Sequence, residues 1–272
     1  MSRTSYRVKK LFRGLAGGAK SKRPQPVSVC SDSSLRVGVA SHTGPRPHNE
    51  DYVAMSQRGD FFAVSDGIGG APFGDVMSRL ACNAAVQAYD DGANVLEAFA
   101  TANEFVSVVS ELLGERSGAT LLLAERVDRQ LNVVSAGDTR AYLLRSGVLE
   151  LITDAGRAHS FSNALNKAVG YGEIDPDEVT LLLEEGDWLL LCTDGVWEYL
   201  SEQRIVEMLT SGGNAPMVAE EIAWEASRVG QDNCTCACVY VDTLDDASTG
   251  TPLLPADLNP YGPNTPDSEF LT

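Results

Sequence analysis

The segment Phe61-Phe62-Ala63-Val64-Ser65-Asp66-Gly67 runs a short apolar sequence directly into an aspartate and a glycine. The pattern recurs where Trp188 leads to Asp194-Gly195, and where Val133 leads to Gly137-Asp138. Short apolar runs that end at turn residues are typical of buried strands. Asp-Gly after a strand is most often only a turn. Carboxylates at several strand ends would nevertheless repel one another if they met, and a cation would have to lie between them.

The composition fits a globular domain with charged flanking segments. The chain has 272 residues, 43% of them hydrophobic, and a net charge of -17. Residues 1–36 contain nine Lys and Arg residues against one Asp, so the remainder is more acidic than the whole chain. Because the phosphates of nucleic acids require a basic surface, we expect no nucleic-acid partner. An acidic domain suits divalent cations held by oxygen ligands.

Three regions are expected along the chain: a basic, disordered arm over 1–34, one domain over 35–241, and an acidic, proline-rich, disordered tail over 242–272. The tail contains five Pro, six acidic residues and no Lys or Arg, and such a composition buries too little apolar surface to order itself. The arm is too poor in apolar residues for a signal peptide, and a membrane-surface or partner-docking helix is its alternative interpretation. No apolar stretch approaches the roughly 20 residues of a transmembrane helix. We therefore expect a cytoplasmic protein, and we predict a monomer.

The domain is predicted to combine about ten strands with four helices. Apolar residues at helical spacing predict helices over 75–90, 94–113, 201–211 and 215–229, the last two capped by Ser201 and Asn214. The predicted strands are 35–41, 51–57, 60–65, 118–127, 131–137, 140–145, 148–152, 178–183, 187–193 and 234–241. Short turns between several of them indicate hairpins. We expect an α+β fold in which two antiparallel sheets pack together and pairs of helices cover the outside.

The six cysteines lack the spacing of a disulfide framework or of a paired zinc motif. Cys234, Cys236 and Cys238 alternate, so on a strand they would share one face. We interpret them as small buried hydrophobic residues in a reducing compartment. A metal cluster is the alternative for this triplet.

Five aspartates recur beside apolar strands: Asp51, Asp66, Asp138, Asp194 and Asp232. Scattered surface acids have no reason to favour strand ends, whereas a site for several metal ions draws its ligands from there. No His or Cys is suitably placed, so the ligands are predicted to be oxygen and the metal Mg²⁺ or Mn²⁺. The Gly67 carbonyl could itself be a ligand. Two such ions form a clamp suited to phosphoryl chemistry.

Six short motifs follow one another along the domain. They are Arg46-Pro47-His48-Asn49-Glu50-Asp51, Asp66-Gly67-Ile68-Gly69-Gly70, Gly118-Ala119-Thr120, Gly137-Asp138-Thr139-Arg140, Cys192-Thr193-Asp194-Gly195 and Asp232-Asn233. In this order they resemble the metal-dependent Ser/Thr protein phosphatases, the PPM or type 2C family, in its compact bacterial form. The resemblance covers about 37–241. It implies a four-layer α-β-β-α sandwich with a dinuclear metal site between the sheets.

The resemblance also implies a ligand set for two Mn²⁺ or Mg²⁺ ions and an optional third. The expected ligands are Asp51, Asp66, the Gly67 carbonyl, Asp138, Asp194 and Asp232. Asp66 would bridge two ions, and Asp51 would bridge them or support the pair from behind. Asp194 and Asp232 would hold the second ion, and Asp138 would join Asp194 at the third.

The implied activity is hydrolysis of phosphoserine and phosphothreonine on proteins, by attack of a water that the metals activate. Arg46 would bind the phosphate through its planar guanidinium group. Arg46 and Asp66 are the two residues expected to be catalytic. Relatives often carry a His where this chain has Ile68, so a metal-bound water is expected to protonate the leaving oxygen, with His48 and His159 as alternatives. Phosphorylated proteins and an opposing Ser/Thr kinase are the implied partners.

One segment departs from the family pattern. The sequence from Thr153 to Ser160 is stretched relative to the Thr-x-Asp-His-Ser-like segment of relatives, and Asn163 to Gly172 is short for a flap beside the site. These departures bear on substrate choice and on the third ion. The alternative functions are a catalytically weak phosphoprotein-binding regulator with the same fold, and a phosphohydrolase acting on a small molecule.

Overall fold

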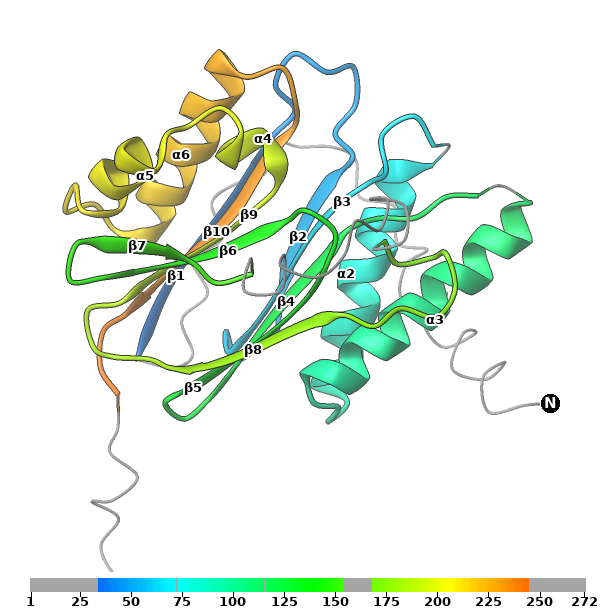
Figure 1. The fold of residues 1–272 in the computed structure, drawn as a ribbon, viewed down its shortest axis with the longest axis horizontal. Helices are drawn as coiled ribbons and strands as arrows, with labels where there is room; N and C mark the ends of the chain where they lie inside the picture. Colours follow the sequence, from blue (N-terminus) through cyan, green and yellow to red (C-terminus); the bar gives the residue numbers. More distant parts are fainter. Residues whose placement is uncertain (1–33, 72, 115, 154–167, 245–272) are drawn as a thin grey trace, which may run out of the picture.

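The computed structural model describes residues 34–71, 73–114, 116–153 and 168–244. Two five-stranded antiparallel sheets pack face to face, and helices cover the outer face of each (Figure 1). The predicted α-β-β-α sandwich is therefore confirmed. The predicted arm and tail lie almost wholly outside the described residues. Within those residues, no helix is both long enough and apolar enough to cross a bilayer.

The two sheets are built from strands that are distant in sequence. The first sheet has the order β1 (Leu35–His42), β10 (Cys234–Val241), β9 (Trp188–Cys192), β6 (Arg140–Arg145) and β7 (Val148–Leu151). The second has the order β2 (Asp51–Met55), β3 (Phe61–Asp66), β4 (Leu121–Val127), β5 (Gln130–Ala136) and β8 (Asp177–Leu182). The chain changes sheet four times, between β1 and β2, between β5 and β6, between β7 and β8, and between β8 and β9. The first two crossings carry several of the predicted site residues.

The helices lie in the two predicted groups. Helices α2 (Gly74–Asp90) and α3 (Val95–Leu113) cover the second sheet, and α4 (Asp194–Trp197), α5 (Glu202–Leu209) and α6 (Ala215–Val229) cover the first. The predicted caps are confirmed, because the side chains of Ser201 and Asn214 accept hydrogen bonds from the first turns of α5 and α6. The short helix α4 was not predicted, since four residues are too few to show a helical period.

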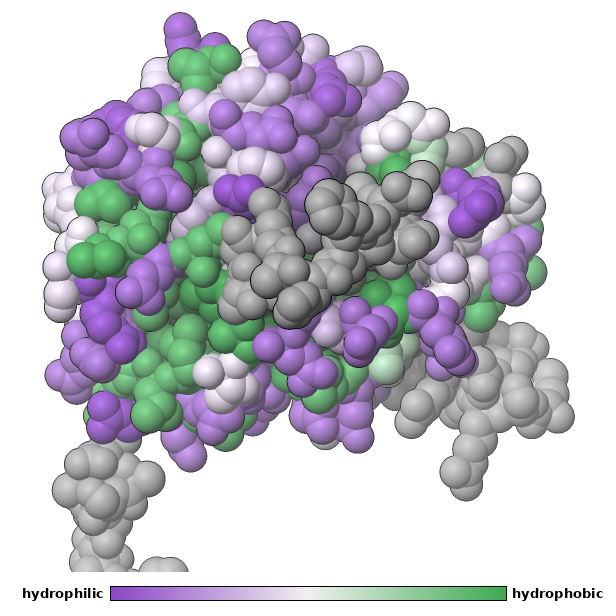
Figure 2. All heavy atoms as spheres, viewed as in Figure 1, coloured by the Kyte–Doolittle hydropathy of each residue, from purple (hydrophilic) through white to green (hydrophobic). Residues whose placement is uncertain are grey.

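Alternation along the strands divides the core into three apolar layers. In β10, Ala237 and Val239 face the other sheet, whereas Cys234, Cys236 and Cys238 face the helices of the first sheet. All three cysteines are buried and free, as expected for small hydrophobic residues. Apolar residues also reach the surface at the sheet edges, as Val148 of β7 and Leu182 of β8 do, and Figure 2 shows apolar surface in green on this face.

Candidate active site

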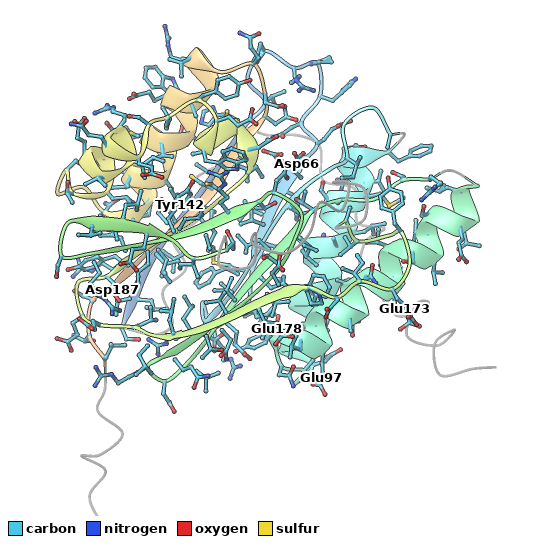
Figure 3. All side chains as sticks on the ribbon, in the orientation of Figure 1. Asp66, Glu97, Tyr142, Glu173, Glu178 and Asp187 are labelled. Atoms are coloured by element: carbon cyan, nitrogen blue, oxygen red, sulfur yellow. The ribbon has the colours of Figure 1, made fainter. Side chains whose placement is uncertain are left out.

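Asp51 and Asp66 meet at one end of the sandwich, where Figure 3 labels Asp66 at the end of β3. Asp51 opens β2, and the register of the antiparallel pair places it directly opposite Asp66. Like charges directly opposite in a sheet are destabilising. The fold therefore creates the repulsion that the sequence pattern suggested.

The connection into β6 and the end of β9 bring Asp138 and Asp194 to the same region. Arg140 pairs with Cys192 in the β6–β9 ladder. Asp138 lies two residues before Arg140, and Asp194 lies two residues after Cys192, at the start of α4. Asp232 joins them from the start of β10. A Cβ built on Gly195 would lie 3.3 Å from the Asp232 Cβ. All five predicted aspartates thus come to one end of the sandwich.

Buried threonine hydroxyls hold the two central aspartates, Asp51 by its carboxylate and Asp66 by its backbone. Thr193 donates to Asp51 Oδ2 at 2.8 Å. Thr120 Oγ1 accepts from the Asp66 backbone N–H at 2.8 Å and lies 2.6 Å from the hydroxyl of Thr139, the neighbour of Asp138. Sequence analysis assigned these threonines no role, although each stands inside one of the six motifs.

Burial makes this end of the sandwich electrostatically unfavourable for its own carboxylates. Burial raises the pKa of Asp51 and of Asp66, and the Asp51 and Asp194 carboxylates raise that of Asp66 further. Burial, followed by the charges of Asp138 and Asp232, raises the pKa of Asp194 to about 7. One carboxylate oxygen of Asp51 and one of Asp194 are buried without a hydrogen-bond partner among the described residues. Such groups require a cation or a proton.

The donor set fits hard divalent cations. It consists of carboxylates and the Gly67 carbonyl, which are the ligands that Mg²⁺ and Mn²⁺ prefer. Gly67 packs against Gly74, and a Cβ on Gly67 would lie 2.5 Å from the Gly74 carbonyl carbon, so this position accepts only glycine. Within the described ranges, no three Asp, Glu, His or Cys side chains are already drawn around one point.

Arg46 lies at the rim of the carboxylate group. Its guanidinium donates to Asp232 Oδ2 at 2.6 Å and to the Gln231 carbonyl at 3.0 Å. The loop that carries it is held by Asn233, whose amide donates to the carbonyls of Thr43 and His48 and whose Oδ1 accepts from the Glu50 N–H. Sequence analysis quoted Asn233 in a motif but missed this role, which depends on contacts about 190 residues apart.

The remaining predicted residues are placed less centrally. His48 is exposed in the loop before β2, and His159 lies outside the described residues together with most of the divergent segment. Ile68 donates its backbone N–H to the Gly118 carbonyl. Isolated bridges join Gly67 to Ala119 and Ala119 to Val169, so the divergent segment lies against the site at Val169.

Comparison with known proteins agrees with this geometry. Residues 40–222 match the family described as protein phosphatase 2C. The chain is 31% identical over 243 residues to the serine/threonine protein phosphatase PstP of Mycobacterium tuberculosis, covering 78% of this chain and 45% of that protein. It is 30% identical over 244 residues to the protein phosphatase PhpP of Streptococcus pneumoniae, covering 78% of this chain and 99% of that protein. The chain thus spans about half the length of the curated relative PstP.

A solved structure extends the comparison. The catalytic domain of PstP in complex with two manganese ions matches with a TM-score of 0.67 at 28% identity, covering 77% of this chain and 99% of that one. The fold and the carboxylate group together define a PPM-type sandwich with a candidate dinuclear centre. The chain belongs to the protein phosphatase 2C family.

Proposed function

We propose that the chain is a metal-dependent serine/threonine protein phosphatase that hydrolyses phosphoserine and phosphothreonine on proteins. One observation carries the proposal: Asp51 is buried beside the half-buried Asp66 and Asp194, and one buried oxygen each of Asp51 and Asp194 has no partner in the described part of the chain. A fold retains such an unfavourable group where cations complete it. The names of the relatives PstP and PhpP support the reaction class.

We assign the expected residues as ligands of two Mn²⁺ or Mg²⁺ ions, with a third ion between Asp138 and Asp194. The full set is Asp51, Asp66, the Gly67 carbonyl, Asp138, Asp194 and Asp232. When bound, such ions offset the charge of a phosphate dianion and lower the pKa of a coordinated water. Thr193 holds the Asp51 carboxylate in place while substrate binds, and the Thr120–Thr139 pair holds the backbone of Asp66.

Arg46 is the proposed phosphate-binding residue. Its pairing with Asp232 neutralises both groups in the structure described here. We propose that Asp232 would be a metal ligand, and that the guanidinium fork of Arg46 would hold two phosphate oxygens. Asn233 keeps the Arg46 loop within reach throughout. The opposing Ser/Thr kinase, the monomeric state, the cytoplasmic location and the boundaries of the domain stay predictions.

Turnover by the full chain tests the function. It would be given p-nitrophenyl phosphate and a phosphothreonine peptide, each with Mn²⁺ or with EDTA. We expect turnover of both only with Mn²⁺. No Mn²⁺-dependent turnover of either would overturn the enzyme proposal and favour the phosphoprotein-binding regulator. Turnover of the aryl phosphate without the peptide would favour a small-molecule phosphohydrolase.

Substitution of the arginine tests its role. Arg46→Ala should lower kcat/KM for both substrates by roughly a hundredfold, which is typical for loss of a charge-stabilising donor. Arg129→Ala is the matched control, because Arg129 is an exposed arginine in the turn between β4 and β5. Equal rates in the two variants would remove Arg46 from the site.

A further inference from the structure

Phe73 has an unusual backbone conformation immediately before α2. Its φ of 64° and ψ of 29° place it in the left-handed region, which bulky residues rarely adopt. The other two described residues with positive φ outside glycine are Asp128 and Ser146, in hairpin turns where short polar side chains tolerate it. Phe73 is therefore the exception among them.

The same position is unfavourable in a second way. Phe73 is the N-cap of α2, and the helix start receives no side-chain hydrogen bond there. Ser, Asn or Asp would cap the helix, and Gly would adopt the conformation without strain. Local stability therefore argues against Phe at this position. Strain of this kind is typically retained where the side chain has a function.

The phenylalanine lies beside the carboxylate site. Gly74, the next residue, packs directly against Gly67 and also lies close to the Glu50 carboxyl group, which is 3.0 Å from the position of a Gly74 Cβ. The side chain of Phe73 is not part of the apolar core. Phe73 is 46% exposed and belongs to none of the three apolar layers.

Two carboxylates accompany the ring at this rim. Asp75 is exposed in the first turn of α2 and directly follows Gly74, whose Cβ position lies 3.0 Å from the Glu50 carboxyl group. An exposed aromatic ring with carboxylates beside it suits a lysine or arginine side chain. The apolar stem of such a side chain packs on the ring, and its charge faces the ring and the acids.

We propose that Phe73 contacts the protein substrate and, with Asp75, binds a lysine or arginine next to the phosphorylated serine or threonine. The inference rests on the proposed phosphatase function and adds a substrate class to it. Phosphoproteins with a basic neighbour at the phosphorylated residue are the preferred substrates. An aryl phosphate has no such neighbour and is indifferent to Phe73.

Three phosphothreonine peptides test the contact, identical except for Arg, Leu or Asp beside the phosphothreonine. In Phe73→Ala, kcat/KM for the Arg peptide should fall roughly three- to tenfold. The Asp peptide and p-nitrophenyl phosphate should stay within about twofold of the wild type. Asp75→Asn should also lower the preference for Arg over Asp. An equal loss on all substrates, or no loss on any, would overturn the proposal.

A stability measurement separates a binding role from a structural one. Phe73→Gly should raise Tm by about 2–4 °C through relief of the strained conformation, while losing the Arg-peptide preference as Phe73→Ala does. Ser146→Gly is the matched control, because it removes the same kind of strain at a turn between β6 and β7 and should leave every substrate unaffected. A fall in Tm for Phe73→Gly would show that the ring stabilises the fold and would overturn the proposal.

Failure of the phosphatase proposal can be told apart from failure of this one. If the wild type turns over no substrate with Mn²⁺, the function is wrong, and calorimetric binding of the three peptides then tests the contact alone. Tighter binding of the Arg peptide that is lost in Phe73→Ala would support it. Equal binding of all three peptides would refute it.

Discussion

The two ends of the β6–β9 strand pair treat a buried aspartate in opposite ways. At one end Arg145 and Asp187 lie one rung beyond the pair Leu144 and Trp188. At the other end Asp138 and Asp194 lie two residues beyond the pair Arg140 and Cys192. One ladder therefore sets an arginine against an aspartate at one end and two aspartates against each other at the opposite end.

Figure 3 labels Asp187 far from Asp66. Neighbouring residues of the same chain supply both the hydrogen-bond donors and the counter-charge of Asp187. It is 1% exposed and accepts from Arg145 Nε at 2.9 Å, from Arg145 Nη2 at 2.6 Å and from the Glu184 N–H at 2.7 Å. Asp51 and Asp194 each keep a buried oxygen without a partner in the described residues. Burial alone thus does not mark a functional carboxylate. What marks it is burial without a cation that the fold supplies.

The largest effect is predicted for a substitution at the end of the sandwich where the five aspartates meet. Asp66→Asn should lower Mn²⁺-dependent turnover by about a thousandfold or more, because it removes the proposed bridging charge between two ions. In EDTA the same variant should melt a few degrees above the wild type, since the buried repulsion with Asp51 and Asp194 is gone. Activity assays and thermal melts check both statements.

Asp128→Asn is the control for that variant, because Asp128 lies in an exposed turn and Asn tolerates its positive φ. It should change neither turnover nor Tm appreciably. Wild-type turnover in Asp66→Asn would show that the ligand assignment is wrong. A lower Tm in EDTA would show that Asp66 stabilises the metal-free fold.

The next largest effect is predicted for a substitution at the opposite end, where Arg145 pairs with Asp187. Arg145→Ala should destabilise the protein by about 3 kcal/mol, because it leaves the Asp187 carboxylate buried without its partner. For a domain of this size the loss corresponds to a fall in Tm of about 6–12 °C. Turnover per folded molecule should remain that of the wild type. A large loss of activity at temperatures where the variant is folded would mean that the two ends are coupled.

The smallest effect is the stabilisation of the fold by added Mn²⁺. Mn²⁺ at about 100 times its dissociation constant should stabilise the folded protein by about 2.7 kcal/mol, which is seen as a rise in Tm. Arg145→Ala should show the same Mn²⁺-dependent rise in Tm, although its Tm without Mn²⁺ is lower. Asp194→Asn should show a smaller rise in Tm. An undiminished Mn²⁺ shift in Asp194→Asn would place the ions elsewhere.

The elements and the site were predictable to different degrees. Strand and helix positions follow from local periodicity and caps, so the ten strands and the capped helices α5 and α6 agree closely with expectation. The roles of Asn233 and Thr193 did not follow, because their partners are Thr43, His48 and Asp51, far along the chain. Local sequence reports the shape of an element, whereas these contacts depend on which elements become neighbours.

Asp51 and Asp187 show the distinction, since Asp51 opens β2 and Asp187 immediately precedes β9, each beside apolar residues. The sequence by itself determined that both would lie at the end of a sheet, through alternation and through the turn residues around them. Only the tertiary structure decided that one faces Arg145 and the other faces Asp66. Electrostatic energy depends on distance in space, and strand register sets that distance between residues far apart in the chain.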